Sequence, residues 1–136
     1  MKRPCLLCLS WILLVTCPLL ARAELVIIVN KENPATKMYL NQVSQFYLGV
    51  SNIFAPVELV EGNPLKAEFY KKVLEKEPAQ VQAVWAKLTF TGKAKPPREF
   101  KSVAEVRKYI AETPNAIGYI DKASADDTVK IIANVQ

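Results

Sequence analysis

The residues best placed for binding chemistry lie at positions 61–66, where a turn leads into a predicted helix. Asn63 can cap this helix, and Pro64 suits its first position. Backbone N–H groups at a helix start, together with the helix dipole, attract anions. The sequence therefore predicts a weak anion site, to which Lys66 adds a positive charge. Helix capping alone also explains Asn63 and Pro64 completely, so both interpretations stay open.

The predicted site draws its donors from two loops. We expect the backbone amides of Leu65, Lys66 and Ala67 to be unpaired and to point at the residues before Asn63. Polar side chains of a neighbouring loop, which follows the first predicted strand, would add further donors. The candidate ligand-binding residues are Asn30, Asn33, Thr36, Glu61, Gly62, Asn63, Leu65 and Lys66.

The composition excludes most catalytic chemistry. The chain has no histidine, and its cysteines, Cys5, Cys8 and Cys17, all lie near the N-terminus. These absences remove the usual zinc ligands and the nucleophile–histidine pairs, and there is no phosphate-loop or dinucleotide fingerprint. A mechanism built on acids alone stays open, although the pair at 126–127 is typical of a solvated turn. We predict a protein that is not an enzyme, with no catalytic residue, no metal site and no cofactor.

The N-terminal residues have the layout of a secretory signal peptide. Lys2 and Arg3 precede an apolar run over residues 6–20, and a small-x-small pattern ends at Ala23. We predict cleavage after Ala23, which makes residues 1–23 the signal peptide and residues 24–136 the mature domain. A retained anchor and a lipid on Cys17 are the alternatives; the run is short for a spanning helix. Cleavage predicts a periplasmic protein without stable membrane insertion.

Cleavage also changes size and charge. Removing residues 1–23 from the 136-residue chain leaves about 113 residues, a common size for one domain. Loss of three basic residues lowers the net charge from +5 to about +2. That value argues against a nucleic-acid partner, which demands a strong basic stripe. Lys93, Lys95 and Arg98 do cluster around two prolines, either as a solvated loop or as a surface for a negatively charged partner.

Hydrophobic periodicity predicts an α/β domain. Continuous or alternating apolar runs predict strands over residues 25–29, 57–60, 115–120 and 128–135. Helical spacing predicts helices capped by Asn41, Asn63 and Ser102, and another that opens at Pro78. The first of these helices is expected to stop at Gly49. We expect a mixed sheet with helices on both faces.

Five blocks occur in an order that points to a family. They are residues 26–30 with Asn33-Pro34, residues 40–49, residues 61–69, Trp85 with residues 90–93, and residues 115–121. In this order they resemble one lobe of the phosphate-type periplasmic solute-binding proteins of ABC transporters. The nearest single block is Ile-Gly-Tyr-Ile at 117–120, which is similar to the family's Ile-Gly-Tyr-Val. The resemblance implies a single lobe of the type II periplasmic-binding-protein fold.

The predicted anion loop departs from the family's Arg-x-Asp-Gly-Ser-Gly-Thr pattern. Leu59 stands at the arginine position and Glu61 at the aspartate position, Gly62 is kept, and the hydroxyl residues are absent. In the family an acid at this place accepts a proton from a protonated oxyanion, which the resemblance would assign to Glu61. Tyr119 either lines a cleft or fills the core beside Gly118, which suits close backbone packing.

Two functions follow from these observations. The first is a secreted solute-binding protein for phosphate or another small oxyanion, linked to phosphate ABC transport. The second is a protein-interaction module of a cell-envelope complex that has lost its ligand. A lone lobe exposes surface that a second lobe would cover, which suits an envelope partner or a self-dimer.

Overall fold

The first strand supplies the centre of the domain. In the computed structural model, which describes residues 23–136, β1 (Leu25–Asn30) is buried along its whole length. The predicted signal peptide lies outside the described residues apart from Ala23, as do all three cysteines. The remaining elements are α1 (Leu40–Tyr47), β2 (Ala55–Leu59), α2 (Pro64–Phe69), η1 (Tyr70–Leu74), α3 (Pro78–Phe90), β3 (Arg98–Phe100), α4 (Val103–Glu112), β4 (Ala116–Asp121), η2 (Lys122–Ser124) and β5 (Val129–Val135).

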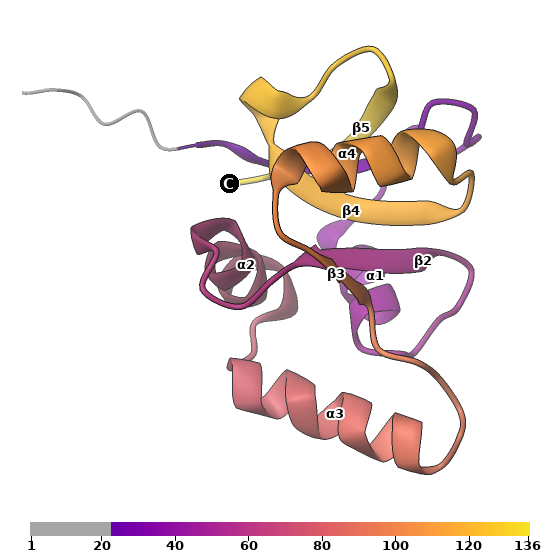
Figure 1. The fold of residues 1–136 in the computed structure, drawn as a ribbon, viewed down its shortest axis with the longest axis vertical. Helices are drawn as coiled ribbons and strands as arrows, with labels where there is room; N and C mark the ends of the chain where they lie inside the picture. The colour runs from indigo at the N-terminus through magenta and orange to yellow at the C-terminus, as the bar shows by residue number, and fades with distance from the viewer. Residues whose placement is uncertain (1–22) are drawn as a thin grey trace, which may run out of the picture.

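The strands form one five-stranded mixed sheet in the order β3-β2-β4-β1-β5. β1 runs antiparallel to both β4 and β5, whereas β2 is parallel to β3 and β4. In Figure 1, α4 lies in front of this sheet and α1 lies behind it. Because both faces of the sheet are covered, a central strand is expected to carry apolar side chains on both sides. Every residue of β1 before Asn30 is apolar. The predicted mixed α/β fold is confirmed.

Tyrosine hydroxyls complete the sheet where β2 and β4 separate. The two strands pair only at their starts, Ala55 with Ala116 and Pro56 with Ile117. Further along, Tyr47 Oη donates to the Val57 carbonyl at 2.7 Å. Tyr119 Oη in turn accepts from the Leu59 amide at 3.1 Å.

These buried hydroxyls satisfy backbone groups that would otherwise be costly to bury. Tyr119 is fully buried and stacks on Phe69 at 4.1 Å, so it belongs to the core and lines no cleft. Next to it, a Cβ on Gly118 would lie 2.6 Å from Ile110 Cδ1, which confirms the expected close packing.

Most helix signals are confirmed, and two predictions are wrong. Asn63 caps α2 and Ser102 caps α4 through their side chains, as predicted. However, the N-cap of α1 is Tyr39 and the helix begins at Leu40, two residues earlier than an Asn41 cap would place it. The segment 98–100, expected to be loop, forms the short edge strand β3. Three residues carry too little periodicity to reveal a strand, and parallel pairing with β2 defines it.

Helix α3 lies apart from the sheet, at the lower end of Figure 1. Trp85, buried as predicted, fixes it to α1 by donating from Nε1 to the Tyr47 carbonyl at 2.9 Å. Gly49 ends α1 with a φ of +72° and lies against Trp85 and Leu88. A side chain there would be strained by its backbone and would displace α3. This helix and the loop after it form part of the wall of the cavity described below.

Candidate functional site

The predicted anion loop follows β2, and its backbone amides are already bonded. Asn63 Oδ1 accepts from the Leu65 amide at 3.0 Å. The Asn63 carbonyl accepts from the amides of Lys66 and Ala67 at 3.1 and 3.4 Å. The expectation that these three amides are unpaired is therefore wrong, because the helix satisfies them with its own cap. Gly62, with a φ of +90°, and Glu61 are exposed in the preceding turn.

Lys66 is held by carboxylates instead of standing free for a ligand. It is only 6% exposed, and its Nζ lies 3.4 Å from Glu58, 3.5 Å from Glu61 and 3.6 Å from Glu99. Glu58 is equally buried and also accepts from Tyr70 Oη at 2.9 Å. We call these three acids with Lys66 the Lys66 cluster. With three negative charges around one positive charge, the cluster repels an anion at short range.

Burial sets the protonation of this cluster. Desolvation raises the pKa of Glu58 above its usual 4.5, and the attraction of Lys66 and the bond from Tyr70 oppose that rise. Burial also raises the pKa of Tyr70, with Glu58 adding to the effect, so its hydroxyl stays a donor. The arrangement is a supported ion pair, and its chemistry suits a positively charged group better than a phosphate.

The other predicted site residues lie at the opposite end of the sheet. β1 is antiparallel to β4 while β2 is parallel to it, so the ends of β1 and β2 point in opposite directions. The expectation that the loop with Asn30, Asn33 and Thr36 adjoins the predicted anion loop is therefore wrong. The sequence of a strand does not show whether it pairs parallel or antiparallel with its neighbours, because the tertiary structure decides that pairing.

Asn30 and Asn33 have partners of their own. Asn30 Nδ2 donates to the carbonyls of Ile110 and Ala111 at 2.9 and 3.0 Å, and so caps the last turn of α4. Asn33 Nδ2 donates to the Pro114 carbonyl at 3.0 Å. Thr36 is exposed on the segment beside β5. In the structure these asparagines hold the connection between α4 and β4 in place.

Two further loop acids are also bound within the chain. Asp121 accepts from Ser124 Oγ at 2.7 Å, and Asp126 accepts from the Thr128 amide at 3.0 Å. Hydrogen bonds from Thr128 lower the pKa of Asp126, with Arg107 nearby at 3.3 Å. Across residues 23–136, no three metal-ligating side chains gather to hold an ion. Within the same range, no helix is long and apolar enough to span a membrane.

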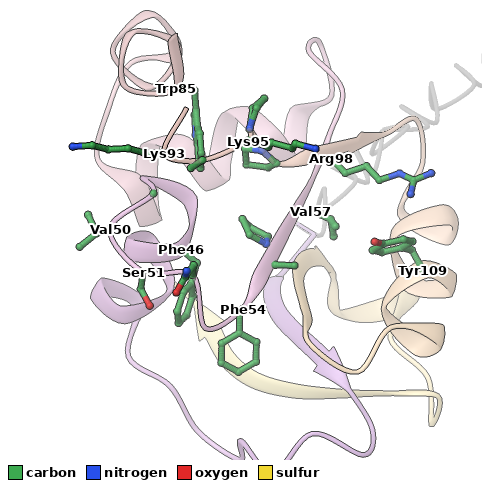
Figure 2. Close-up of a pocket in the computed structure, with 17 residues that line it drawn as sticks. Phe46, Val50, Ser51, Phe54, Val57, Trp85, Lys93, Lys95, Arg98 and Tyr109 are labelled. Atoms are coloured by element: carbon green, nitrogen blue, oxygen red, sulfur yellow. The ribbon is translucent and has the colours of Figure 1, made fainter. Parts of the chain in front are cut away.

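A different cavity is lined by positively charged side chains. It measures about 560 Å³ and is lined by residues 46, 49–52, 54–57, 85, 93–98 and 109. These residues come from the end of α1, the loop between α1 and β2, the starts of β2 and β3, the middle of α3, the loop after α3, and α4. The lining includes Lys93, Lys95 and Arg98 but no acid. We call this cavity the basic pocket, and Figure 2 shows its side chains.

The cations of the basic pocket are without carboxylate partners. Among the described residues, none of the ion pairs involves Lys93, Lys95 or Arg98. In Figure 2, Lys95 and Arg98 extend toward the side where Tyr109 lies, whereas Lys93 extends in the opposite direction. The Arg98 guanidinium lies 5.1 Å from the centre of the Tyr109 ring and 5.3 Å from that of Phe100. Such cation–π contacts orient the guanidinium without neutralising it.

The sequence alone indicates only part of this site. The cluster of Lys93, Lys95 and Arg98 around two prolines is visible as a basic loop. The apolar wall, which includes Phe46, Phe54 and Trp85, comes from segments far apart in the chain, and periodicity predicts such residues only as core.

The fold is similar to that of phosphate-binding proteins of ABC transporters. One similar structure is a protein from Clostridium perfringens assigned as a phosphate ABC transporter substrate-binding protein, with bound phosphate (TM-score 0.67, 18% identity, 80% of this chain, 44% of that chain). Another is an ABC-type phosphate transport receptor from Vibrio cholerae (TM-score 0.64, 19% identity, 80% of this chain, 45% of that chain). A third is PstS from Borrelia burgdorferi (TM-score 0.62, 15% identity, 81% of this chain, 46% of that chain).

The likeness to these structures establishes the fold. The chain has the fold of part of a periplasmic binding protein and spans less than half the length of these structures. No protein-family model matches the sequence, and no curated protein shows significant similarity to it.

Proposed function

We propose that this chain is a secreted, non-enzymatic solute-binding protein that binds phosphate or another small oxyanion in connection with phosphate ABC transport. Its residues 1–23 serve as the signal peptide, and residues 24–136 form the binding domain in the periplasm. The fold shared with phosphate-binding proteins supports a binding role, although fold by itself does not define a ligand.

The observation that carries the proposal is the charge of the basic pocket. Lys95 and Arg98 extend toward one side of it, and its lining holds three cations and no acid. Sites for small ligands are usually concave and carry a small number of placed polar or charged groups. Arginine is well suited to oxyanions, because its guanidinium offers parallel N–H donors to two oxygens at once.

The predicted anion loop is the weaker of the two candidate sites. Its amides at Leu65, Lys66 and Ala67 are bonded to Asn63, and the acids of the Lys66 cluster surround its only buried lysine. An anion at this loop would have to displace Glu61 and approach Glu99. We therefore place the oxyanion in the basic pocket and keep the loop as the competing location in the test.

The test is a thermal-shift titration of the purified protein with phosphate and sulfate at low ionic strength. A ligand that binds only the folded state stabilises it by about 2.7 kcal/mol at a hundredfold excess over Kd. We expect a saturable rise in Tm that is lost in Arg98→Gln and kept in Lys87→Gln. Lys87 lies on the exposed face of α3 outside the pocket, so its variant makes a similar change of charge.

The same titration separates the two locations. If Glu61→Gln or Asn63→Ala removes the shift while Arg98→Gln keeps it, the anion binds at the loop after β2. If no oxyanion shifts Tm at millimolar concentration, the proposed function is wrong.

Exposed apolar side chains favour a second candidate, a protein-interaction module of the cell envelope. Phe90 is 93% exposed, and Val50 and Ile53 are 73% and 74% exposed. Phe90 ends α3, and Val50 lies beside Gly49, against which α3 packs. Exposed apolar side chains of this size are typical of contact surfaces when they gather. Sedimentation of the wild type against Phe90→Ser tests self-association: a dimer that the variant dissociates would support this candidate.

A further inference from the structure

We infer that two copies of this chain associate through the outer face of α3, with the two helices running antiparallel. The inference goes beyond the proposed function and does not depend on the oxyanion site. It assigns a partner to the exposed ring of Phe90. Three features of α3 carry it: an exposed apolar face, the symmetry of that face, and the charges at the two ends of the helix.

Helix α3 packs on the rest of the domain along one side only. Its buried residues are Val81 and Trp85, and Figure 1 shows the helix apart from the sheet, at the end of the domain. With 3.6 residues per turn, the side about half a turn away from Val81 and Trp85 faces outward. Four exposed apolar residues share that outward side, and we call them the outer stripe: Ala79, Ala83, Ala86 and Phe90.

The outer stripe has the spacing by which two helices pack together. Its members are separated by 4, 3 and 4 residues along the chain, the alternation that forms the apolar seam of a helix pair. Exposed alanines alone say little, because alanine is simply a good helix former. Phe90 is different, since its ring is 93% exposed at one end of the seam. Such a ring gains most when another apolar surface covers it.

The outer stripe is complementary to itself when it is reversed. Positions 79 and 90 have the same midpoint as positions 83 and 86, between residues 84 and 85. A two-fold axis at this midpoint would therefore place Phe90 of each copy against Ala79 of the other, and Ala83 against Ala86. The large ring then meets the small side chain at both ends of the pair. A parallel pair would instead oppose the two Phe90 rings and leave a gap at the other end.

The charges at the ends of α3 favour the same direction. Glu75 and Glu77 precede the helix, Lys87 and Lys93 lie at and after its end, and all four are exposed. Among residues 23–136, no ion pair involves any of these four. Lys76, between the two acids, leaves the start of the helix with a single net negative charge. Antiparallel pairing brings this acidic start beside the basic end of the other copy, and the helix dipoles then also attract.

Sedimentation equilibrium of the secreted protein, over about 1–200 µM, measures the association. Because two helices alone make a small interface, we expect a dimer with a Kd in the micromolar range. Phe90→Ala is expected to weaken it at least about tenfold. Adding Ala79→Phe to Phe90→Ala should restore the dimer, since each ring then faces the shortened side chain at position 90. Ala104→Phe, the same change at the exposed second residue of α4, is the matched control and should leave Kd unchanged.

Cysteine pairing tests the direction of the helices. In a mixture of Ala83→Cys and Ala86→Cys, oxidation should link the two copies between positions 83 and 86, as peptide mass spectrometry would identify. Two copies of Ala79→Cys should not link through position 79. In the antiparallel pair these positions are about 16 Å apart along the axis, which a disulfide does not span. A parallel pair would place them side by side.

The outcomes separate this inference from the proposed function. A monomer at about 200 µM would overturn the inference and leave the outer stripe to a different envelope protein. A dimer that Phe90→Ala leaves intact, a double variant that stays monomeric, or a link through position 79 would overturn it as well. None of the four stripe residues lines the basic pocket. A dimer without any oxyanion-dependent rise in Tm would therefore overturn the oxyanion function and leave the inference standing.

Discussion

Replacing Lys66 by methionine tests how the Lys66 cluster is built. Lys66 is the cation within 4 Å of three carboxylates, and its partner Glu58 is as deeply buried as the lysine itself. Lys66→Met keeps an unbranched side chain of similar length but removes the charge. Glu58 would then remain buried with a single hydrogen bond, the one from Tyr70.

The expected loss is about 3 kcal/mol in the free energy of unfolding at neutral pH. Removing one partner of a buried ion pair costs about 3–5 kcal/mol, because the other charge is left uncompensated. The lower value applies, since the Lys66–Glu58 distance is 3.4 Å and Tyr70 still donates to Glu58. The contacts with Glu61 and Glu99, whose side chains are 71% and 50% exposed, add little because water screens them.

The loss should depend on pH. Burial raises the pKa of Glu58 above its usual 4.5, so the folded state holds this proton more tightly than the unfolded state does. A raised folded-state pKa contributes stability that is present below the unfolded pKa and is lost as pH rises through the folded pKa. Removing Lys66 takes away an attraction that lowers this pKa, and therefore raises it further. The variant should be strongly destabilised near neutral pH and nearly normal in acid, where Glu58 is neutral.

Urea denaturation followed by circular dichroism, at about pH 7.5 and about pH 4, measures both expectations. Lys72→Met is the matched control: Lys72 pairs with Glu68 at 2.8 Å on a partly exposed helix surface, so its loss should stay below about 1 kcal/mol. Adding Glu58→Gln to Lys66→Met should restore part of the stability. A loss below about 1 kcal/mol at neutral pH, or an equal loss at both pH values, would refute this account of the cluster.

Three further substitutions test local packing and capping. Gly118→Ala should lower the free energy of unfolding by about 1–3 kcal/mol, because its methyl group would overlap Ile110; an unchanged Tm would contradict the close packing. Asn30→Ala should cost about 1–3 kcal/mol by leaving buried carbonyls of α4 without a donor, and hydrogen exchange should rise first at the end of that helix. Asn63→Ala should cost about 1 kcal/mol through loss of the bond to the Leu65 amide, and a thermal melt that matches the wild type would show the cap to be dispensable.

Local chemistry made the elements of this fold predictable. The cap-and-proline start of α2, the proline at the start of α3 and the side-chain cap of α4 each depend on residues within one turn of the helix. The apolar run of β1 was recognisable for the same reason. Errors arose where a distant partner decides, as with β3, which exists because β2 offers it a parallel edge.

The candidate site also combines features that the sequence predicts with features that only the tertiary structure shows. The sequence by itself determined that Asn63 starts a helix, that Trp85 is buried, and that a basic loop surrounds Pro96 and Pro97. Only the tertiary structure decided that Lys66 is bound by Glu58, and that Arg98 lies over the rings of Tyr109 and Phe100.

The physical reason is the range of the interactions involved. Caps, turns and apolar periodicity act between residues close in the chain, so a sequence displays them directly. The direction of β1 relative to β2, which places Asn30 far from Asn63, arises from pairing through β4, a strand about ninety positions further along the chain than β1. Charge pairing and pocket shape depend on such long-range neighbours, and for that reason the structure, not the sequence, decided which cations among the described residues pair with carboxylates.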